Sequence, residues 1–356
     1  MPYLCCMSHE TYMRRCLQLA KIGLPTAAPN PSVGAILVSN NQIIGEGYTS
    51  PYGGAHGEVN CIEDCKRRMG KIPSDAVLYV SLEPCSHFGK TPPCSNLIIE
   101  EKIQTVVVAC TDINPLVAGK GIQKLRDAGI RVIENVLEDE ARELNKSFFQ
   151  SHKTKRPFIT LKWAQTAKGY FAPAAEKQFW ITNQKSKLFV HMLRRNHMAI
   201  LVGSRTARID NPKLTTRLIQ GKNPLRIVLQ GDEPMDTTIE LLTDNEETLV
   251  FGSEATNLEF PKEWIQLTKN QAPLSQILNT LYERNIQSLL VEGGAYTLQQ
   301  FIDADLWDEA YVLIGNKELK EGKLAPRLES KMVKSFTIFG DKVHHFKNVK
   351  NDLVTA

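Results

Sequence analysis

The 356-residue sequence lacks the features that would place it in a membrane, outside the cell or among disordered chains. No stretch approaches the roughly 18 uninterrupted apolar residues that a membrane-spanning helix needs. The first residues, MPYLCCMSHETYMRR, show no basic segment followed by a long apolar run, so no secretory signal is visible. With only 22 glycines and 18 prolines, collagen-like and low-complexity architectures are excluded. We therefore expect a globular enzyme in the cytoplasm.

A strong net charge is also missing. The formal net charge of +4 divides into −1 for residues 1–152, with 15 Lys and Arg against 16 Asp and Glu, and +5 for residues 153–356. Proteins that bind DNA or RNA usually carry a clearly basic surface, so we expect no nucleic-acid partner. We also expect no membrane partner. The positive excess of the second part weakly favours a phosphorylated small molecule, and a homo-oligomer is left open.

The length corresponds to about two domains, and the hydrophobic patterning predicts α/β architecture in both. In the first half, an amphipathic helix over 13–24 should end at the prolines of 25–31, and a β-hairpin follows around 35–44. The remaining predicted elements of this half are helices at 56–68, 98–102, 122–128 and 136–149 and strands at 77–82, 105–110 and 131–133. Their alternation predicts an α/β sandwich around a mostly parallel or mixed sheet.

The polar, basic segment SHKTKRP at 151–157 is the predicted boundary, which gives domains over 1–150 and 157–356. The second domain is also expected to be α/β. Its predicted strands are 158–163, 199–202, 225–229, 249–251, 288–291 and 311–314, and its predicted helices are 185–195, 274–284 and 295–302.

The strongest motif is HGE at 56–58 together with Cys85, which follows a proline, and Cys94. One imidazole nitrogen and two thiolates are a ligand set that zinc favours, with a fourth position open for water. Zinc turns bound water into a nucleophile near neutral pH. A carboxylate two residues after the histidine can then shuttle protons to a leaving amine, which is the zinc-deaminase pattern. We predict that His56, Cys85 and Cys94 bind Zn²⁺ and that Glu58 is the general acid and base.

The other reading of these residues is a closed structural zinc site, which needs a fourth protein ligand. His87 is the nearest candidate, but it lies only two residues after Cys85. The remaining cysteines are not expected to form disulfides, because no export signal is visible. Cys61 and Cys65, one helical turn apart, are expected to be core thiols.

Eight residues, SHFGKTPP, separate Cys85 from Cys94, where the general deaminase pattern has two. With this spacing the chain resembles the bifunctional riboflavin-biosynthesis proteins, in which a pyrimidine deaminase is fused to a reductase. The matching segments are EPCSHFGKTPPC (83–94), PNPSVGA (29–35), HGEVN (56–60), DINPLVAGKG (112–121), LKWAQT (161–166), WIT (180–182), HMLRRNHMAILVGSRTARIDNPKLTTR (191–217), VEGG (291–294) and DLWDE (305–309). The resemblance spans roughly residues 8–315.

For the first domain the resemblance implies a cytidine-deaminase-like α/β/α sandwich. It would use Zn²⁺ to remove an amine by hydrolysis from 2,5-diamino-6-(5-phosphoribosylamino)pyrimidin-4-one. The implied substrate-binding residues are Asn30, His87, Lys90, Thr91, Asp112 and Asn114. A lysine and hydroxyl donors near the metal suit a phosphorylated substrate. From the residues alone, a solvated loop charge at Lys90 and ordinary turn residues at Asn30 and Asp112 stay open.

For the second domain the resemblance implies a dihydrofolate-reductase-like α/β domain that uses NADPH to reduce the ribosyl group to a ribityl chain. The implied NADPH-binding residues are Ala164, Trp180, Thr206, Asp210, Gly294, Ala295, Tyr296, Thr297, Leu298, Gln299 and Gln300, and the implied substrate-binding residues are Arg194, Leu214, Arg217 and Glu292. Lys162 lies on an apolar strand, and a buried lysine needs a partner, which favours a substrate role. Glycines 293 and 294 would let a pyrophosphate approach a helix N-terminus, although Gly-Gly after a strand is also an ordinary tight turn.

Five positions depart from the family pattern. Thr49 stands where a histidine is usual, Gln178 replaces a small hydroxyl residue, and Lys168, Met198 and Gln230 each replace an acidic residue. Four of them lie in the second half, so one hypothesis is that only the first domain is fully active. Two other functions remain as alternatives: a nucleoside or tRNA deaminase with an appended nucleotide-binding domain, and a catalytically inactive nucleotide-binding regulator.

Overall fold

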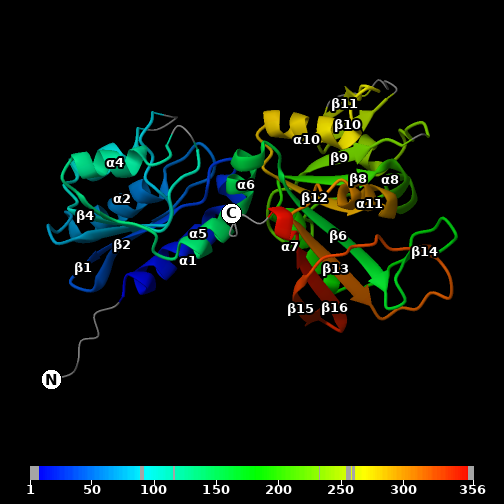
Figure 1. Cartoon of the computed structure of the whole chain (residues 1–356), viewed down its shortest axis with the longest axis horizontal. Coiled ribbons are helices and arrows are strands. Elements are labelled where there is room, and N and C mark those ends of the chain that lie inside the picture. The colour runs from blue at the N-terminus through cyan, green and yellow to red at the C-terminus, as the bar shows by residue number, and fades with distance from the viewer. Residues whose placement is uncertain are drawn as a thin grey trace. The chain divides into compact units, whose positions relative to one another are not determined.

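The computed structural model describes residues 8–88, 92–114, 117–231, 233–253, 258 and 261–351. The chain divides into two compact units, residues 1–154 and 155–356 (Figure 1). Each unit has its own sheet, and each is described by itself. Within the described ranges, no helix combines the length and the apolar character that crossing a bilayer requires.

The first unit is a five-stranded mixed sheet in the order β2-β1-β3-β4-β5. Strands β1 and β2 form the predicted antiparallel hairpin, and β3, β4 and β5 run parallel to one another. The strands are β1 (Gly34–Ser39), β2 (Gln42–Tyr48), β3 (Val77–Val80), β4 (Thr105–Val108) and β5 (Arg131–Ile133); the helices are α1 (His9–Ala27), α2 (Gly57–Met69), α3 (Cys94–Glu100), α4 (Lys120–Asp127), α5 (Glu138–Leu144) and α6 (Lys146–Thr154).

Helices cover both faces of this sheet, as Figure 1 shows, with α1 and α5 on one side and α2 and α4 on the other. Glycines let the helices approach closely. A Cβ on Gly34 would lie 1.9 Å from the carbonyl oxygen of Cys16 in α1, and a Cβ on Gly47 would lie 2.3 Å from the amide of Cys61 in α2. The predicted α/β sandwich is therefore confirmed.

Two predicted element boundaries in this unit are wrong. Helix α1 continues to Ala27 instead of ending before the first proline, and the chain turns extended at Ala28, which precedes Pro29. The single helix expected over 136–149 is two helices, because Asn145 interrupts it with a side chain bonded to a distant loop. The polar segment 151–157 is helical as far as Thr154, so it is not a linker throughout.

The second unit contains a nine-stranded sheet in the order β11-β10-β9-β8-β12-β6-β13-β16-β15, and a small sheet of β7 and β14. The strands from β11 to β13 are parallel, and β16 and β15 are antiparallel. The strands are β6 (Phe158–Thr166), β7 (Tyr170–Ala172), β8 (Ala199–Gly203), β9 (Leu225–Leu229), β10 (Thr248–Gly252), β11 (Lys262–Gln266), β12 (Ser288–Gly293), β13 (Glu309–Gly315), β14 (Lys323–Leu324), β15 (Met332–Ile338) and β16 (Asp341–Lys347).

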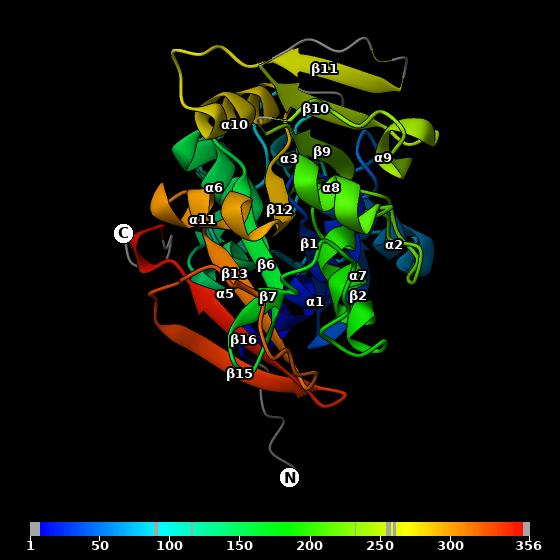
Figure 2. The same cartoon turned by 90° about the vertical axis from the view of Figure 1, so that its right-hand side faces the viewer.

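Two apolar cores enclose this sheet, because neighbouring residues of a strand point to opposite faces. Leu289 and Val291 of β12 pack beneath α10 and α11, whereas Leu290 packs on the other face with Leu193 of α7 and Ala207 of α8. Figure 2 shows α10 and α11 on one side of the strands and α7, α8 and α9 on the other. The helices are α7 (Ser186–Arg195), α8 (Ser204–Asp210), α9 (Glu240–Thr243), α10 (Pro273–Glu283) and α11 (Ala295–Asp303), and a 3₁₀ turn covers Val349–Asn351.

The C-terminal hairpin of β15 and β16, which is not among the elements predicted from the sequence, is bonded to the start of α7. The buried Asp341 carboxylate accepts hydrogen bonds from the Asn183 amide at 2.9 Å and from the Ser186 hydroxyl at 2.6 Å. These bonds fix the N-terminal end of α7, which carries His191 and Arg194 about one and a half and about two turns further along.

Candidate functional site

Three elements of the first unit bring His56, Cys85 and Cys94 together. His56 is the N-cap residue of α2, Cys85 follows the exit of β3, and Cys94 is the first residue of α3. The amide of Cys94 donates to the Cys85 sulfur at 3.3 Å, and the amide of Ser95 donates to the Cys85 carbonyl at 3.1 Å. Cys85 and Cys94 therefore lie next to each other, although eight residues separate them in the chain.

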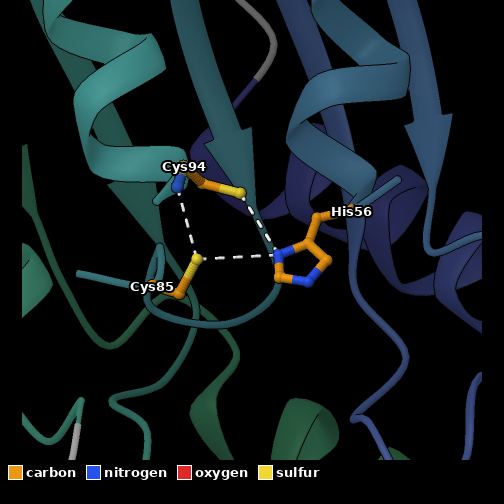
Figure 3. A group of neighbouring side chains, drawn as sticks. All are labelled: His56, Cys85 and Cys94. Atoms are coloured by element: carbon orange, nitrogen blue, oxygen red, sulfur yellow. Dashed lines mark hydrogen bonds between the residues drawn. The ribbon is translucent and has the colours of Figure 1, made fainter. Parts of the chain in front are cut away.

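The ligand atoms of these residues converge on one point, as Figure 3 shows. The His56 Nδ1 lies 3.3 Å from the Cys94 sulfur and 3.6 Å from the Cys85 sulfur, and all three ligand atoms lie within 4.8 Å of one another. A tetrahedral zinc ion bonded to nitrogen and sulfur at about 2.0 and 2.3 Å separates these ligand atoms by about 3.6 Å. The residues present therefore fit zinc.

Glu58 lies beside this cluster on the first turn of α2. It is buried, and among the described residues its Oε2 has no hydrogen-bond partner. Burial raises the pKa of Glu58 to about 7, opposed by the nearby His56. A buried carboxyl with an unused oxygen is what a proton-transfer group needs before its substrate arrives.

The two cysteines differ in acidity because they share a hydrogen bond. The bond from Cys94 lowers the pKa of Cys85 to about 4, against the effect of burial. The same bond, together with burial, raises the pKa of Cys94. The hydrogen bond to Cys85 also raises the pKa of His56. This arrangement has the chemistry of a metal-binding thiolate pair rather than of two core thiols.

The loop that carries Asn30 lies at the same edge of the sheet. The Ser81 hydroxyl, at the exit of β3, accepts a hydrogen bond from the Gly34 amide at the start of β1. The loop also packs closely against α2, since a Cβ on Gly57 would lie 2.5 Å from the Val33 carbonyl oxygen. The buried Asn145 side chain fixes this loop through both polar groups of the Ser32 backbone, accepting at 2.8 Å and donating at 3.0 Å. Asn30 itself is half-buried.

Thr49 completes the support of this loop. Its hydroxyl accepts from the Val33 amide at 2.8 Å and lies 3.3 Å from the Val33 carbonyl, and the side chain is buried. Although threonine replaces the usual histidine at this position, its hydroxyl therefore supports the backbone of the loop that carries Asn30.

Asp112 and Asn114 follow β4, next to the exit of β3. Asp112 is buried, its carboxylate accepts from the Asn114 amide at 2.7 Å, and burial raises its pKa to about 6. The Cys85 sulfur is close enough to contribute to that rise. His87 is half-buried, and its Nδ1 has no partner among the described residues. Lys90 and Thr91 lie outside the described residues.

In the second unit the residues expected to bind substrate form a buried charged cluster. Glu292 at the end of β12 forms a two-pronged ion pair with Arg194 of α7, at 2.7 and 2.8 Å. Lys162 of the neighbouring strand β6 lies 3.8 Å from the same carboxylate. Burial opposes ionisation of Glu292, but the charges of Arg194 and Lys162 outweigh it and hold the pKa at about 2. Burial lowers the pKa of Lys162.

His191, Leu214 and Arg217 adjoin this cluster. Burial, with the charges of Arg194 and Arg217, lowers the pKa of His191 to about 4, so this imidazole is neutral at pH 7. The Leu218 amide approaches its Nδ1 at 3.5 Å. Leu214 is fully buried with a φ of 54°, and Arg217 reaches the Thr215 hydroxyl at 3.4 Å.

The ends of β8 and β12 form a cradle that fits a phosphate-bearing cofactor. A Cβ on Gly294 would lie 2.9 Å from the Thr206 hydroxyl, and a Cβ on Gly203 would lie 2.6 Å from the Thr297 hydroxyl. Gly294 is the N-cap residue of α11 and provides no side-chain cap, so the first amides of the helix are left for another acceptor. Helix N-termini of this kind bind anionic groups, and the donor set fits the diphosphate of NADPH.

The other residues expected to bind NADPH differ in their exposure and in their contacts. Asp210 in α8 is close enough to Lys162 for their charges to interact, and Gln178, one of the departures, donates to the Asp210 carbonyl at 3.0 Å. Trp180 is half-exposed beneath the Lys187 ammonium, and Ala164 lies on β6. The residues of α11 differ in exposure. Leu298 is buried in the apolar core, Tyr296 is exposed, and Ala295 and Gln300 are half-buried. The Gln299 side chain accepts a hydrogen bond from the Arg327 amide and donates one to Asp303.

Sequence reasoning missed one residue of the first site. Glu83 belongs to the matching segment 83–94, and its buried carboxylate accepts four main-chain hydrogen bonds from the segment around Asp112. An acidic residue directly after a buried strand and two residues before a metal ligand is the signal that could have found it.

Comparisons with known proteins find relatives of both units of the chain. The family model for the cytidine and deoxycytidylate deaminase zinc-binding region matches residues 7–110, and the model for the RibD C-terminal domain matches residues 157–329. The chain is 41% identical over 318 residues to riboflavin biosynthesis protein RibD of Aquifex aeolicus, covering 88% of each chain. It is 34% identical to RibD of Escherichia coli K12, covering 88% of this chain and 89% of that one.

Solved structures show the same similarity. The deaminase and 5-amino-6-(5-phosphoribosylamino)uracil reductase of Thermotoga maritima superposes with a TM-score of 0.86 at 36% identity, covering 95% of this chain and 98% of that one. RibD of Acinetobacter baumannii has a TM-score of 0.87 at 31% identity, with the same coverage. The expected cytidine-deaminase-like and dihydrofolate-reductase-like folds are thereby confirmed. The chain belongs to the RibD family of bifunctional riboflavin-biosynthesis enzymes, which join a zinc-dependent deaminase to an NADPH-dependent reductase.

Proposed function

We propose that residues 1–150 act as the deaminase domain and residues 157–356 as the reductase domain, working in succession on one small molecule. The first domain hydrolyses an amine from 2,5-diamino-6-(5-phosphoribosylamino)pyrimidin-4-one and releases ammonia. The second reduces the ribosyl group of the product to a ribityl chain. The relative from Thermotoga maritima, which carries both activities in its name, supports this order of steps.

In the deaminase domain, His56, Cys85 and Cys94 would hold zinc, with the separations given above. Zinc there supplies a Lewis acid that lowers the pKa of a water molecule. Glu58 takes the proton from that water and delivers it to the leaving amine, a role that its pKa of about 7 suits, because it can both accept and release a proton near neutral pH.

The substrate ring is held from both sides of the metal cluster. Asn30 offers its amide from the loop braced by Asn145 and Thr49, and Asp112 and Asn114 offer polar groups from the loop after β4. His87 presents an imidazole nitrogen that is buried and unpartnered among the described residues. Lys90 and Thr91 are proposed to contact the phosphate, on the resemblance alone.

In the reductase domain, NADPH would lie across the ends of β8 and β12 and supplies the hydride. The cradle of Thr206, Gly294 and the start of α11 holds its phosphates. Ala164, Trp180 and Asp210 are proposed to line the rest of the cofactor site. Lys162, Arg194 and Glu292 orient the sugar as one charged unit, with Leu214 and Arg217 beside them.

One observation supports the deamination most directly. The buried Glu58 carboxyl, with one oxygen unpartnered among the described residues, lies on the first turn after a histidine whose Nδ1 is 3.3 Å from a cysteine sulfur. A zinc site kept for structure alone has no use for such a group. This also argues against the nucleotide-binding regulator.

The test is to give the purified chain the phosphoribosylamino diaminopyrimidinone and to follow two signals in sequence. Ammonia should appear without any cofactor, and NADPH should then be oxidised, with loss of absorbance at 340 nm, once it is added. Deamination of free cytidine or of an RNA hairpin, with none of the pyrimidinone, would overturn the proposal. Ammonia release without NADPH oxidation would confine activity to the first domain, as the departures in the second half allow.

We further propose that the enzyme works in the cytoplasm on this small molecule, without a nucleic-acid or membrane partner. The net charge of −1 over residues 1–152 supports the absence of a nucleic-acid surface around the deaminase site.

A further inference from the structure

The carboxylate of Glu83 accepts hydrogen bonds from four main-chain amides, which all lie in one stretch of the chain. Its Oε2 accepts from Asp112 at 3.1 Å and from Gly119 at 2.9 Å, and its Oε1 accepts from Gly121 at 2.8 Å and from Ile122 at 3.2 Å. The side chain is 3% exposed. An ionised carboxyl is an acceptor only, and its two oxygens together can accept four such bonds.

These four bonds join two functional segments. On one side is the exit of β3, where Pro84 and the metal ligand Cys85 follow Glu83 directly. On the other side is the loop after β4, which begins with Asp112 and Asn114 and ends where α4 starts. The two segments also pack tightly, since a Cβ on Gly121 would lie 1.9 Å from the Pro84 carbonyl oxygen.

The two segments depend on Glu83 to different degrees. The exit of β3 has other anchors, because the Glu83 amide donates to Cys110 at 2.9 Å and the Ser95 amide donates to Cys85 at 3.1 Å. In the loop after β4, the amides of Val117 and Ala118 bond back to Asn114 within the loop. The four bonds to the Glu83 carboxylate join this loop and the start of α4 to the strand exit, so removal of the carboxylate should move the loop more than the metal ligand.

We propose that Glu83 is a positioning residue for the deamination: its carboxylate fastens the backbone at Asp112, at Gly119 and at the start of α4 against the metal-bearing strand exit and thereby sets the affinity for the substrate. This inference rests on the proposed deamination. Glu83 contacts neither the metal ligand atoms nor Glu58 through any of these bonds; it acts through Asp112 and Asn114, which are proposed above to contact the substrate.

Glu83→Gln is the sharpest change, because the amide keeps the shape and replaces one acceptor oxygen with a donor. Whichever way the amide turns, two of the four main-chain amides face an NH₂ group. We expect the KM for the diaminopyrimidinone to rise at least tenfold, with kcat reduced less than threefold. The zinc content should stay at one per chain. Hydrogen exchange of the amides over 112–122, measured by mass spectrometry on the full chain, should accelerate at least tenfold.

Asp75→Asn is the matched control. Asp75 precedes the opposite end of β3, and its carboxylate accepts from the Ser39 hydroxyl at 2.8 Å. It should leave the KM and the exchange of 112–122 unchanged. NADPH oxidation with the deaminated substrate, which reports the second domain, should be the same in all variants and serves as the internal measure of folded protein.

An unchanged KM in Glu83→Gln would overturn the proposal, as would a fall in kcat at constant KM or a loss of zinc in proportion to the loss of activity. If Glu83→Gln does not fold, Glu83→Asp is the replacement test, because it keeps the carboxylate on a shorter side chain. A KM of Glu83→Asp equal to that of the wild type would also overturn the proposal. Exchange rates and zinc content need no turnover, so they test Glu83 even if the wild type releases no ammonia, a result that would instead refute the proposed function.

Discussion

Arg194 and Glu292 meet in a two-pronged ion pair, with Nε 2.7 Å from Oε1 and Nη2 2.8 Å from Oε2. Both side chains are nearly buried, at 10% and 8% exposure, and Lys162 adds a second cation at 3.8 Å from the carboxylate. The pair links α7 to the end of β12 at the place where the reductase site is proposed. A buried charge network of this kind is stable only while every charge keeps its partner.

Glu292→Gln should therefore destabilise the second unit and stop the reduction. Two buried cations lose their counter-charge, which lowers the free energy of unfolding by about 3 kcal/mol. All four tryptophans, 163, 180, 264 and 307, lie in this unit, so urea unfolding followed by tryptophan fluorescence reports it alone. Ammonia release by the first unit should persist.

The control for this change is Glu263→Gln, because Glu263 pairs with Arg284 at a largely exposed position. An exposed ion pair contributes about 0–1 kcal/mol, so this variant should unfold nearly as the wild type does. Equal stability of the Glu292 and Glu263 variants would contradict the importance given to the buried network.

His191 should make the stability of the second unit depend on pH between 6.5 and 4. Its pKa is held at about 4 in the folded chain, mainly by burial, against 6.5 for the ordinary group. Within this window the unfolded chain binds a proton that the folded chain does not, so the free energy of unfolding falls as the pH falls. His191→Asn should flatten this dependence in fluorescence-monitored urea titrations.

The comparison for that experiment is the wild-type chain, titrated with urea over the same pH range. A His191→Asn protein with the full wild-type slope would show that another group is responsible.

Glu58→Gln should separate metal binding from proton transfer. The amide cannot shuttle a proton, so kcat for ammonia release should fall by about 10²–10⁴-fold. Zinc should remain, because Glu58 is not among the ligands. Glu63→Gln, an exposed position on the same helix, is the control and should keep full activity. Undiminished ammonia release by Glu58→Gln would remove Glu58 from the mechanism.

The proposed binding of the NADPH phosphates at the ends of β8 and β12 can be tested by adding one methyl group at Gly294. Gly294→Ala places a Cβ 2.9 Å from the Thr206 hydroxyl, where one or the other must shift. The KM for NADPH should rise about tenfold, since the first amides of α11 would be displaced from the phosphates. Gly231→Ala, whose Cβ would meet the Ser204 hydroxyl at an ordinary 3.6 Å, should not change it. Identical KM values for both variants would place the cofactor elsewhere.

The metal cluster could be predicted from the sequence because its chemistry is carried by residue types at characteristic spacings. His56, Cys85 and Cys94 are a ligand set that few other functions require. The α/β class followed equally well from hydrophobic periodicity, and the structure contains each strand predicted in the second half, with its limits shifted by at most a few residues.

What the sequence could not reveal are bonds between distant residues. Asn145 breaks a helix because its amide bonds to Ser32, 113 positions earlier. Glu83 depends on amides that lie 29 to 39 positions later in the chain. Local propensity contains no information about such partners, so the break in the helix predicted at 136–149 and the role of Glu83 were both missed.

Thr49 illustrates the same point for a departure from the family pattern. From the sequence, the missing histidine suggests one lost substrate contact. In the fold, the Thr49 hydroxyl supports the Val33 backbone in the loop that carries Asn30. The effect of threonine at this position therefore includes its support of the loop backbone, which the residue type alone does not reveal.

Zinc binding by His56, Cys85 and Cys94 is the central requirement of the proposed deamination. The direct measurement is elemental analysis of the chain purified without chelators, made in parallel with the rate of ammonia release, for the wild type, Cys94→Ser and the core thiol control Cys65→Ser. We predict one zinc per chain in the wild type and in Cys65→Ser, and the loss of both zinc and ammonia release in Cys94→Ser with NADPH oxidation of the deaminated substrate intact. Full zinc content in Cys94→Ser, or ammonia release by a metal-free wild type, would contradict it.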